Sequence, residues 1–126
     1  MPITQYVKFW VEDGILYFVY NPSTFINLKI AKKIVEQRIA YQNEISYPIL
    51  CDLRNLKAAD KAARDYMAVE GTYMATAVAL LIDQNYSERL SAQFMKTSSP
   101  TVPVQEFFSI KEAVAFLNKY KKKHFG

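Results

Sequence analysis

The chain has 126 residues, 51% of them hydrophobic, which favours one folded domain over residues 1–126 and excludes a disordered chain. Its formal net charge is +4, from 16 basic and 12 acidic residues. The excess lies entirely in residues 111–126, so residues 1–110 are electrically balanced and we expect no nucleic-acid partner.

The N-terminal part predicts a β-hairpin. Two runs rich in aromatic and β-branched residues, Tyr6–Glu12 and Ile15–Tyr20, flank Asp13-Gly14. An Asp-Gly pair between such runs indicates a type I′ turn, which needs positive φ at both central positions. Asn-Pro-Ser at residues 21–23 then breaks the pattern. The first strand would lie at a sheet edge, where Trp10 suggests pairing of two copies in a homodimer.

Helices and strands alternate along the rest of the chain. Helices are predicted at Leu28–Glu44, Lys61–Glu70 and Tyr86–Lys96, and a last one begins at Ile110. Strands are predicted at Pro48–Leu53, Thr76–Ile82 and Val104–Phe108. Asn27, Asp60 and Ser109 have the side chains and positions of helix N-caps. The predicted inner faces of the first and last helices are Leu28, Ala31, Ile34, Val35 and Ile39, and Ile110, Ala113, Val114, Leu117 and Tyr120.

The order of elements is therefore β-β-α-β-α-β-α-β-α. Alternating β and α units favour a parallel sheet, and the N-terminal hairpin adds one antiparallel strand. We predict a single α/β domain with a mixed, mostly parallel sheet of about five strands and four helices.

Short motifs accompany this order. A strand ends in Asp52-Leu53-Arg54, residues 55–60 (Asn-Leu-Lys-Ala-Ala-Asp) follow, and the next helix carries Ala63-Arg64-Asp65-Tyr66. The loop Ser99-Pro-Thr-Val-Pro103 precedes the last strand. With these features the chain resembles the STAS-like fold, in particular the small SpoIIAA-like bacterial proteins with the fold of anti-sigma-factor antagonists.

The chain departs from that family at one motif. Anti-sigma-factor antagonists carry Asp-Ser-Ser-Gly or a close variant at this helix start, and a kinase phosphorylates one of the hydroxyls. The corresponding residues here are Asp60-Lys61-Ala62-Ala63, without a hydroxyl. A phosphoryl switch adds nearly two negative charges at a helix N-terminus, and it needs an acceptor. We therefore expect the scaffold of the family without its phosphoserine switch.

The chain holds no complete catalytic, metal or cofactor motif. Cys51 is the single cysteine and is interpreted as an inert core thiol, and the single histidine, His124, lies in the basic C-terminal end, residues 118–126, which we expect to be frayed. The three glycines are too far apart for a phosphate-binding loop. We expect a non-enzymatic protein without a cofactor. No signal peptide or membrane-length apolar run is seen, so we expect a cytoplasmic protein without a transmembrane segment.

Mixed charges at the predicted carboxyl edge of the sheet give the first candidate site. Parallel strands and helix N-termini meet there, and ligands or partners usually bind at that edge. The candidate residues are Asp52, Arg54, Asp60, Lys61 and Arg64, with Asp83 and Asn85 beside them. We expect a regulatory or adaptor domain that binds a protein partner here. Helix capping and ordinary (i, i+4) ion pairs explain several of these residues equally well.

Methionine and aromatic residues give the alternative site. SpoIIAA-like proteins also resemble lipid-binding domains of the CRAL-TRIO type, which implies a carrier for a small apolar ligand. The residues proposed to line its pocket are Met67, Phe94, Met95 and Phe107. Filling of an ordinary core explains the same residues, and the sequence leaves both readings open.

Overall fold

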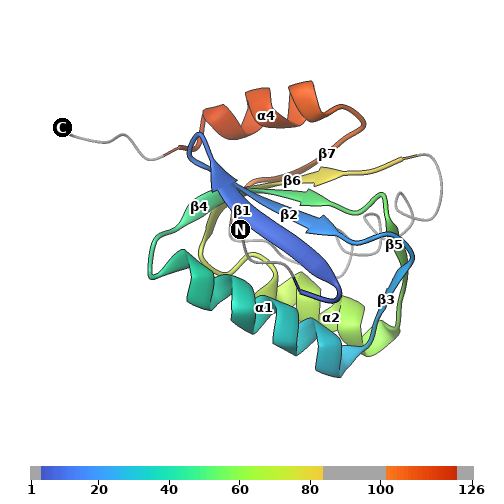
Figure 1. The fold of residues 1–126 in the computed structure, drawn as a ribbon. Coiled ribbons are helices and arrows are strands. Elements are labelled where there is room, and N and C mark those ends of the chain that lie inside the picture. The colour runs from blue at the N-terminus through green and yellow to red at the C-terminus, as the bar shows by residue number, and fades with distance from the viewer. Residues whose placement is uncertain (1–3, 84–101, 122–126) are drawn as a thin grey trace.

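A computed structural model describes residues 4–83 and 102–121. Its main sheet has the strand order β1-β2-β4-β6-β7. The strands are β1 (Val7–Glu12), β2 (Ile15–Tyr20), β4 (Tyr47–Asp52), β6 (Ala75–Leu81) and β7 (Val104–Phe107). The described helices are α1 (Leu28–Gln42), α2 (Lys61–Glu70) and α4 (Ile110–Asn118). Figure 1 shows α4 on one face of the sheet and α1 and α2 on the other, so the domain has three layers.

The predicted hairpin and sheet are confirmed. Strands β1 and β2 pair antiparallel, with Val7 opposite Tyr20 and Glu12 opposite Ile15. The turn residues Asp13 and Gly14 have φ of 51° and 77°, as a type I′ turn requires. All other pairs in the sheet are parallel, so it is the mixed, mostly parallel sheet that the element order predicted.

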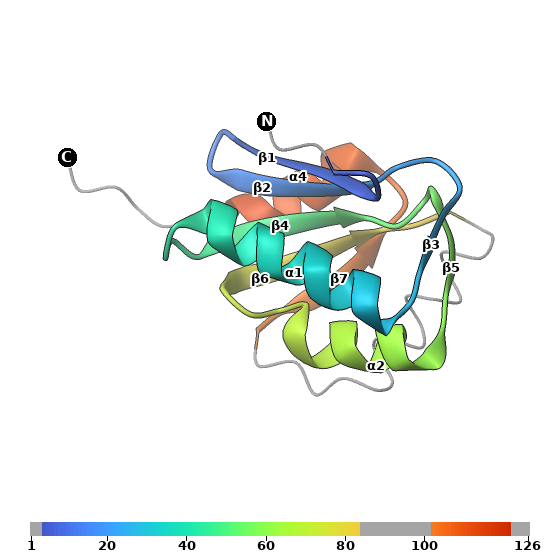
Figure 2. The ribbon, with the colours of Figure 1, turned by 60° about the horizontal axis from the view of Figure 1, so that its bottom comes forward.

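A second, two-stranded sheet was not predicted. Strand β3 (Thr24–Ile26) pairs in parallel with β5 (Leu56–Ala59). The sequence reading placed a break before β3 and treated residues 55–60 as a connection, because runs of three and four residues are too short to show a period of two. Figure 2 shows β3 and β5 side by side at the end of the molecule where α1 and α2 begin. We call this pair the β3–β5 rim.

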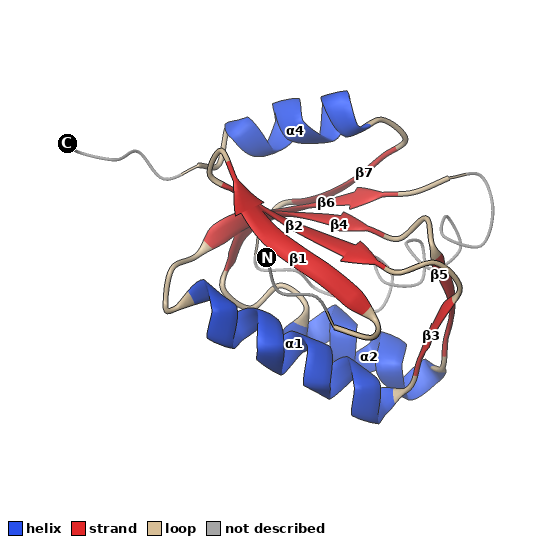
Figure 3. Ribbon diagram, viewed as in Figure 1, coloured by secondary structure: helices blue, strands red, loops and turns tan. Residues whose placement is uncertain are grey.

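The helix starts agree with the sequence. Asn27, Asp60 and Ser109 accept hydrogen bonds from the backbone N–H groups three residues later, at 2.9, 2.8 and 3.4 Å. Helix α2 has the predicted bounds, whereas α1 ends at Gln42 because Asn43 is left-handed, with φ of 49°. The helix predicted at Tyr86–Lys96 lies outside the described residues, so three of the four predicted helices are seen (Figure 3).

Two separate cores fill the spaces between the layers. The larger one lies between the sheet and α1 and α2, and includes Phe9, Phe18, Tyr20 and Ile34. The smaller one lies against α4, and its buried members are Ile15, Leu50, Ala77, Ala79, Leu81, Ala113 and Leu117. Successive residues of β2, β4 and β6 belong to different cores, as alternating strand side chains require.

The predicted inner faces of the helices are correct only in part. Ala31, Ile34 and Val35 of α1 are buried, as are Ala113 and Leu117 of α4, but Leu28 and Ile39 are half-buried. The prediction for Ile110 was wrong, because this first residue of α4 is 47% exposed. A side chain in the first turn extends past the end of the sheet that the helix covers.

The end of the chain is seen as far as Lys121. Helix α4 ends at Asn118, so the lysines that follow are not part of its last turn. The Lys121 ammonium group lies 3.4 Å from the carboxylate of Asp13 in the hairpin turn. Residues 122–126, with His124 and the rest of the basic end, lie outside the described residues.

None of the helices that the structure describes is long and apolar enough to cross a membrane. Within the same residues, no three histidine, cysteine or acidic side chains gather as a metal site would require.

Candidate functional site

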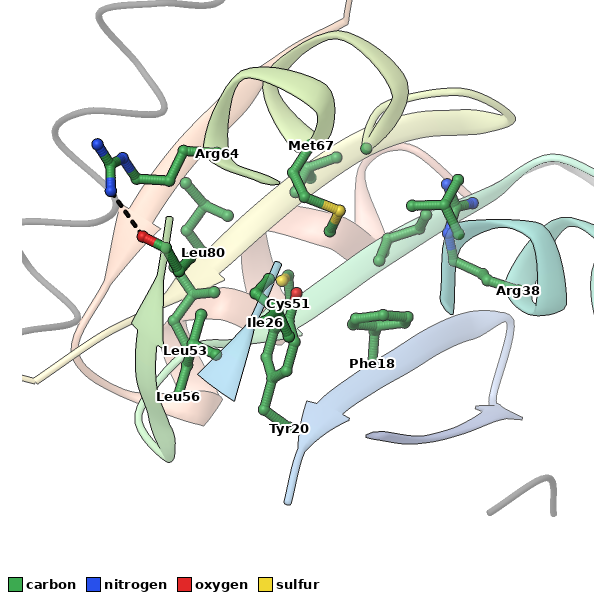
Figure 4. A pocket seen from close by; sticks show the side chains of 15 residues that line it. Phe18, Tyr20, Ile26, Arg38, Cys51, Leu53, Leu56, Arg64, Met67 and Leu80 are labelled. Atoms are coloured by element: carbon green, nitrogen blue, oxygen red, sulfur yellow. Dashed lines mark hydrogen bonds between the residues drawn. The ribbon is translucent and has the colours of Figure 1, made fainter. Parts of the chain in front are cut away.

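An apolar cavity of about 70 Å³ lies between the sheet, α1, α2 and the β3–β5 rim. Figure 4 shows the side chains around it. The strands of the sheet contribute Phe18, Tyr20, Ile49, Cys51, Val78 and Leu80, and Leu53 follows β4 directly. The helices and the rim contribute Val35, Arg38, Arg64, Met67, Ile26, Leu56 and Ala59, and Gly71 follows α2 directly. Most of these side chains are apolar, and two of them are arginines.

The local sequence explains why this face of the sheet has a cavity. Alternation along β2, β4 and β6 points Phe18, Cys51 and Val78 at the same side. Opposite them, Ala59 of the rim is a small residue where a larger side chain could have filled the space. Met67 from the middle of α2 extends a flexible apolar side chain toward the cavity (Figure 4).

Arg38 brings a positive charge into this apolar interior. Its side chain lines the cavity, and the residue is only 3% exposed. Its Nη1 group donates to the Gln42 side-chain oxygen and, at 3.0 Å, to the Tyr73 carbonyl oxygen. Its Nη2 atom is buried and has no hydrogen-bond partner among the residues that the structure describes. Among the ion pairs found over residues 4–83 and 102–121, none includes Arg38.

Burial is the main influence on the ionisation of Arg38. It lowers the pKa of the guanidinium to about 10, while the nearby Cys51 and Tyr20 oppose the shift. The group is therefore still charged at neutral pH. An isolated charge in an apolar interior is costly, because it gives up its hydration without gaining a counter-ion.

Cys51 and Tyr20 are the other two ionisable groups at the centre of the cavity. Burial raises the pKa of the Cys51 thiol to about 12, and Asp52 adds to the shift. Burial also raises the pKa of the Tyr20 phenol well above its ordinary value. Both groups are neutral at pH 7. Cys51 is half-buried although it lies on a central strand between covering layers, so the surface that it exposes faces the cavity.

Arg64 lies on the other side of the cavity from Arg38 (Figure 4). Its Nη1 group donates to the Ala59 carbonyl oxygen at 2.6 Å, which ties the first turn of α2 to β5. The residue is half-buried, so its charge keeps contact with solvent. The sequence placed Arg64 on an exposed protein-binding edge, whereas its side chain borders the cavity.

The other charged residues of the predicted edge lie next to the rim. Arg54 forms two side-chain hydrogen bonds with the Asp52 carboxylate, at 3.0 and 2.9 Å. These bonds raise the pKa of the Arg54 guanidinium, and the carboxylate of Asp83 contributes to the same shift. Asp52, Arg54 and Asp83 therefore do come together at the carboxyl ends of β4 and β6. Asn85 lies outside the described residues.

Asp60 and Lys61 have local partners as well. Asp60 caps α2 through the Ala63 N–H. Lys61 pairs with Asp65, 2.7 Å away and one turn later in the helix. Five of the predicted edge residues thus have a partner within this chain, which accounts for their positions without an external ligand: Asp52, Arg54, Asp60, Lys61 and Arg64.

Two of the four residues predicted to line an apolar pocket, Met67 and Phe107, lie within the described residues. Met67 lines the cavity. The prediction for Phe107 was wrong: it belongs to the α4 side of the sheet, where its ring centroid is 5.3 Å from that of Phe116. Alternation along β7 puts its side chain on the face opposite Met67. Phe94 and Met95 lie outside the described residues.

The sequence analysis overlooked Arg38, although a signal was present. Counting along α1, Ala31, Ile34, Arg38 and Gln42 recur at intervals of three and four residues, which is the spacing of one buried stripe. All four are buried. Two long polar residues inside a stripe that is otherwise apolar indicate an interior polar site rather than a solvated surface.

Comparison with known proteins places the chain in a family. A family model described as "Domain of unknown function (DUF7793)" matches residues 9–121, so the chain belongs to this family. The fold is similar to the crystal structure of an uncharacterised protein of the DUF3478 family from Shewanella loihica PV-4, which has a SpoIIAA-like fold. The TM-score is 0.60 at 12% identity, over 93% of this chain and 98% of the other. The resemblance to the SpoIIAA-like fold is thereby confirmed. No curated protein matches the sequence.

Proposed function

We propose that this DUF7793 domain is a non-catalytic binding domain that holds a small, largely apolar ligand in the cavity between the sheet and α1 and α2. The observation that carries the proposal is the cavity itself, whose apolar lining comes from three strands, two helices and the β3–β5 rim. Ligand sites in small domains are usually preformed, apolar hollows with a few polar groups.

The size of the cavity limits the ligand. At about 70 Å³ it is smaller than the engineered cavity of about 150 Å³ that accepts benzene. The buried part of the ligand is therefore a short aliphatic group. Movement of the flexible Met67 side chain would provide extra room for a slightly longer chain.

Titration with 1-hexanol, followed by methyl NMR, tests this proposal. We expect shift changes at the methyl groups of Ile26, Leu53 and Val78, which surround the cavity, and none at Leu117 on the other face. Native mass spectrometry of freshly purified protein is a second measurement, and a retained organic mass would support the proposal. If the alcohol moves no cavity methyl signal and no mass is retained, the proposal is wrong.

A matched pair of variants shows whether binding occurs in the cavity. Ala59→Leu adds three carbon atoms to a side chain that lines it and should abolish the 1-hexanol response. Ala62→Leu adds the same atoms to an exposed position of α2 and should leave the response unchanged. Equal binding by both variants would place the alcohol elsewhere.

The second candidate function is the protein-binding adaptor. Exposed residues on and beside the β3–β5 rim favour it, since Phe25 is 60% exposed next to Ala58 of β5, and Arg54 and Lys61 flank that strand with exposed charges. An exposed aromatic ring among charges is typical of protein-binding surfaces. On this reading Asp52 and Asp60 position the strand end and the helix start, and Arg54 and Lys61 contact the partner.

Charge reversal tests the adaptor function. The double variant Arg54→Glu, Lys61→Glu should lose co-purifying proteins that the wild-type domain retains, as measured by quantitative mass spectrometry. Lys111→Glu with Lys119→Glu, two exposed positions at α4, is the control with the same change of net charge. Equal retention by both double variants would count against the rim as the interface.

A further inference from the structure

Arg38 is a buried cation for which the described residues provide no anion. Three of its features are independent of one another: the residue is 3% exposed, its Nη2 atom has no hydrogen-bond partner, and its side chain lines an apolar cavity. The other buried side-chain atom without a partner in the described chain, Oε1 of Gln37, belongs to a residue that does not line the cavity.

The neighbours of Arg38 do not neutralise it. Gln42 and the Tyr73 carbonyl group are neutral acceptors, and both bind the same nitrogen, Nη1. The second terminal nitrogen of the guanidinium group, Nη2, therefore has no acceptor among the described residues. A planar guanidinium with free N–H groups is the protein group that best matches a carboxylate, through charge-assisted hydrogen bonds.

Cys51 and Tyr20 do not supply the missing negative charge. The raised pKa values of both groups keep them protonated at neutral pH. They add polar but uncharged atoms between the apolar part of the cavity and Arg38. Arg38 thus places a buried cation at one side of the apolar interior, whereas the charge of Arg64 at the other side keeps contact with solvent.

We infer that the ligand of this cavity is an amphipathic anion, a short-chain aliphatic carboxylic acid, whose carboxylate is bound by Arg38. This inference rests on the proposed function and adds the chemical class of the ligand. The apolar group of the acid lies among Ile26, Leu53 and Val78, and its carboxylate receives the N–H groups that are otherwise unused. The ligand then serves as the counter-ion that the buried guanidinium lacks.

Comparison of hexanoate with 1-hexanol at pH 7 tests the inference on the unmodified protein. The two probes share a chain length and differ in the charged end. We expect hexanoate to bind at least tenfold more tightly, as roughly one charge-assisted hydrogen bond provides. Equal affinities would overturn the inference and leave the apolar site in place. Absence of binding by either probe would overturn the proposed function and this inference together.

Two arginine variants identify the group that binds the carboxylate. Arg38→Met should remove the preference for hexanoate and retain binding of 1-hexanol. Arg64→Met, at the other side of the same cavity, is the matched control and should keep the preference. If only Arg64→Met loses the preference for hexanoate, Arg64 and not Arg38 binds the carboxylate, and the inference is wrong. If Arg38→Met does not fold, the side-chain Nε–H resonance of Arg38 in the wild-type protein should shift with hexanoate and not with 1-hexanol; equal shifts would overturn the assignment.

Discussion

On the face of the sheet that α4 covers, the helix packs directly on small side chains, whereas on the opposite face α1 and α2 leave a cavity. Strand β6 presents Ala77 and Ala79 to α4, and both are 0% exposed, as are Ala113 and Leu117 of the helix. Alanine on strand and helix lets the two backbones approach closely.

The cavity face has larger side chains and is packed less completely. Phe18, Tyr20, Met67 and Leu80 surround empty space, and Arg38 brings a charge into it. Protein interiors normally have few voids larger than a water molecule. The same strands therefore support one closely packed face and another that leaves a cavity beside a buried charge.

The largest loss of stability is expected from a substitution on the α4 face. Leu117→Ala should lower the free energy of unfolding by about 2–5 kcal/mol, because it leaves a hole in a tightly packed core. Urea denaturation followed by circular dichroism measures the change. A loss below about 1 kcal/mol would mean that this face is packed as loosely as the other.

Substitutions that enlarge a buried side chain should show the difference in packing between the two faces most directly. Ala79→Leu, under α4, should cost about 1–3 kcal/mol because the core there has no space. Ala59→Leu, which fills the cavity, should cost less than Ala79→Leu or increase stability. Thermal unfolding of the two variants side by side provides the comparison. If both substitutions are equally destabilising, the proposed contrast in packing is wrong.

Cys51 on the cavity face should also make the stability of the domain depend on pH. Burial raises the pKa of Cys51 from its ordinary 9.0 to about 12. The folded protein therefore keeps a proton that the unfolded chain releases above pH 9, so this contribution to stability is complete below pH 9 and falls as the pH rises toward 12. The expected loss is on the order of 1 kcal/mol at pH 10.

Cys51→Ala is the control for that prediction. The variant should lack this part of the decline when the free energy of unfolding is measured from pH 8 to pH 10.5. Parallel curves for the variant and the wild type would contradict a buried, protonated thiol. At pH 8 the native thiol should also resist alkylation by iodoacetamide, because the thiolate is the reactive species.

The smallest change in stability is expected for an exposed residue outside both cores. Lys61→Ala removes the 2.7 Å pair with Asp65 on the exposed side of α2. Exposed (i, i+4) pairs contribute only about 0.3–0.5 kcal/mol, so the free energy of unfolding should change by no more than this. A larger loss, measured by urea denaturation, would show that the first turn of α2 depends on this pair.

Most of the main sheet could be predicted from the sequence because its signals are local. Asp13-Gly14 specified the hairpin, Asn27, Asp60 and Ser109 marked helix starts, and uniformly apolar runs indicated β4 and β6. The β3–β5 rim could not be predicted, since such short strands form only where tertiary contacts bring them together.

The candidate site was predicted much less well, because a cavity depends on packing. Met67 was named for it, but Phe107 was assigned to the wrong face. The face to which a strand residue points is known only once the register of that strand in the sheet is known. Arg64 was named for a different role. Arg38 was overlooked because an arginine in a lysine-rich helix looks like a surface residue until its spacing from Ile34 is considered.

The strand order β1-β2-β4-β6-β7 has a consequence for how the domain is assembled. Each strand of the main sheet pairs with the strand that precedes it in that sheet along the chain. Chains are synthesised from the N-terminus, so each new strand meets a neighbour that has already been made. Both helices of the cavity face lie within residues 4–83, whereas α4 begins only at Ile110. We expect a nascent chain to build the cavity face first and to gain its most tightly packed layer last.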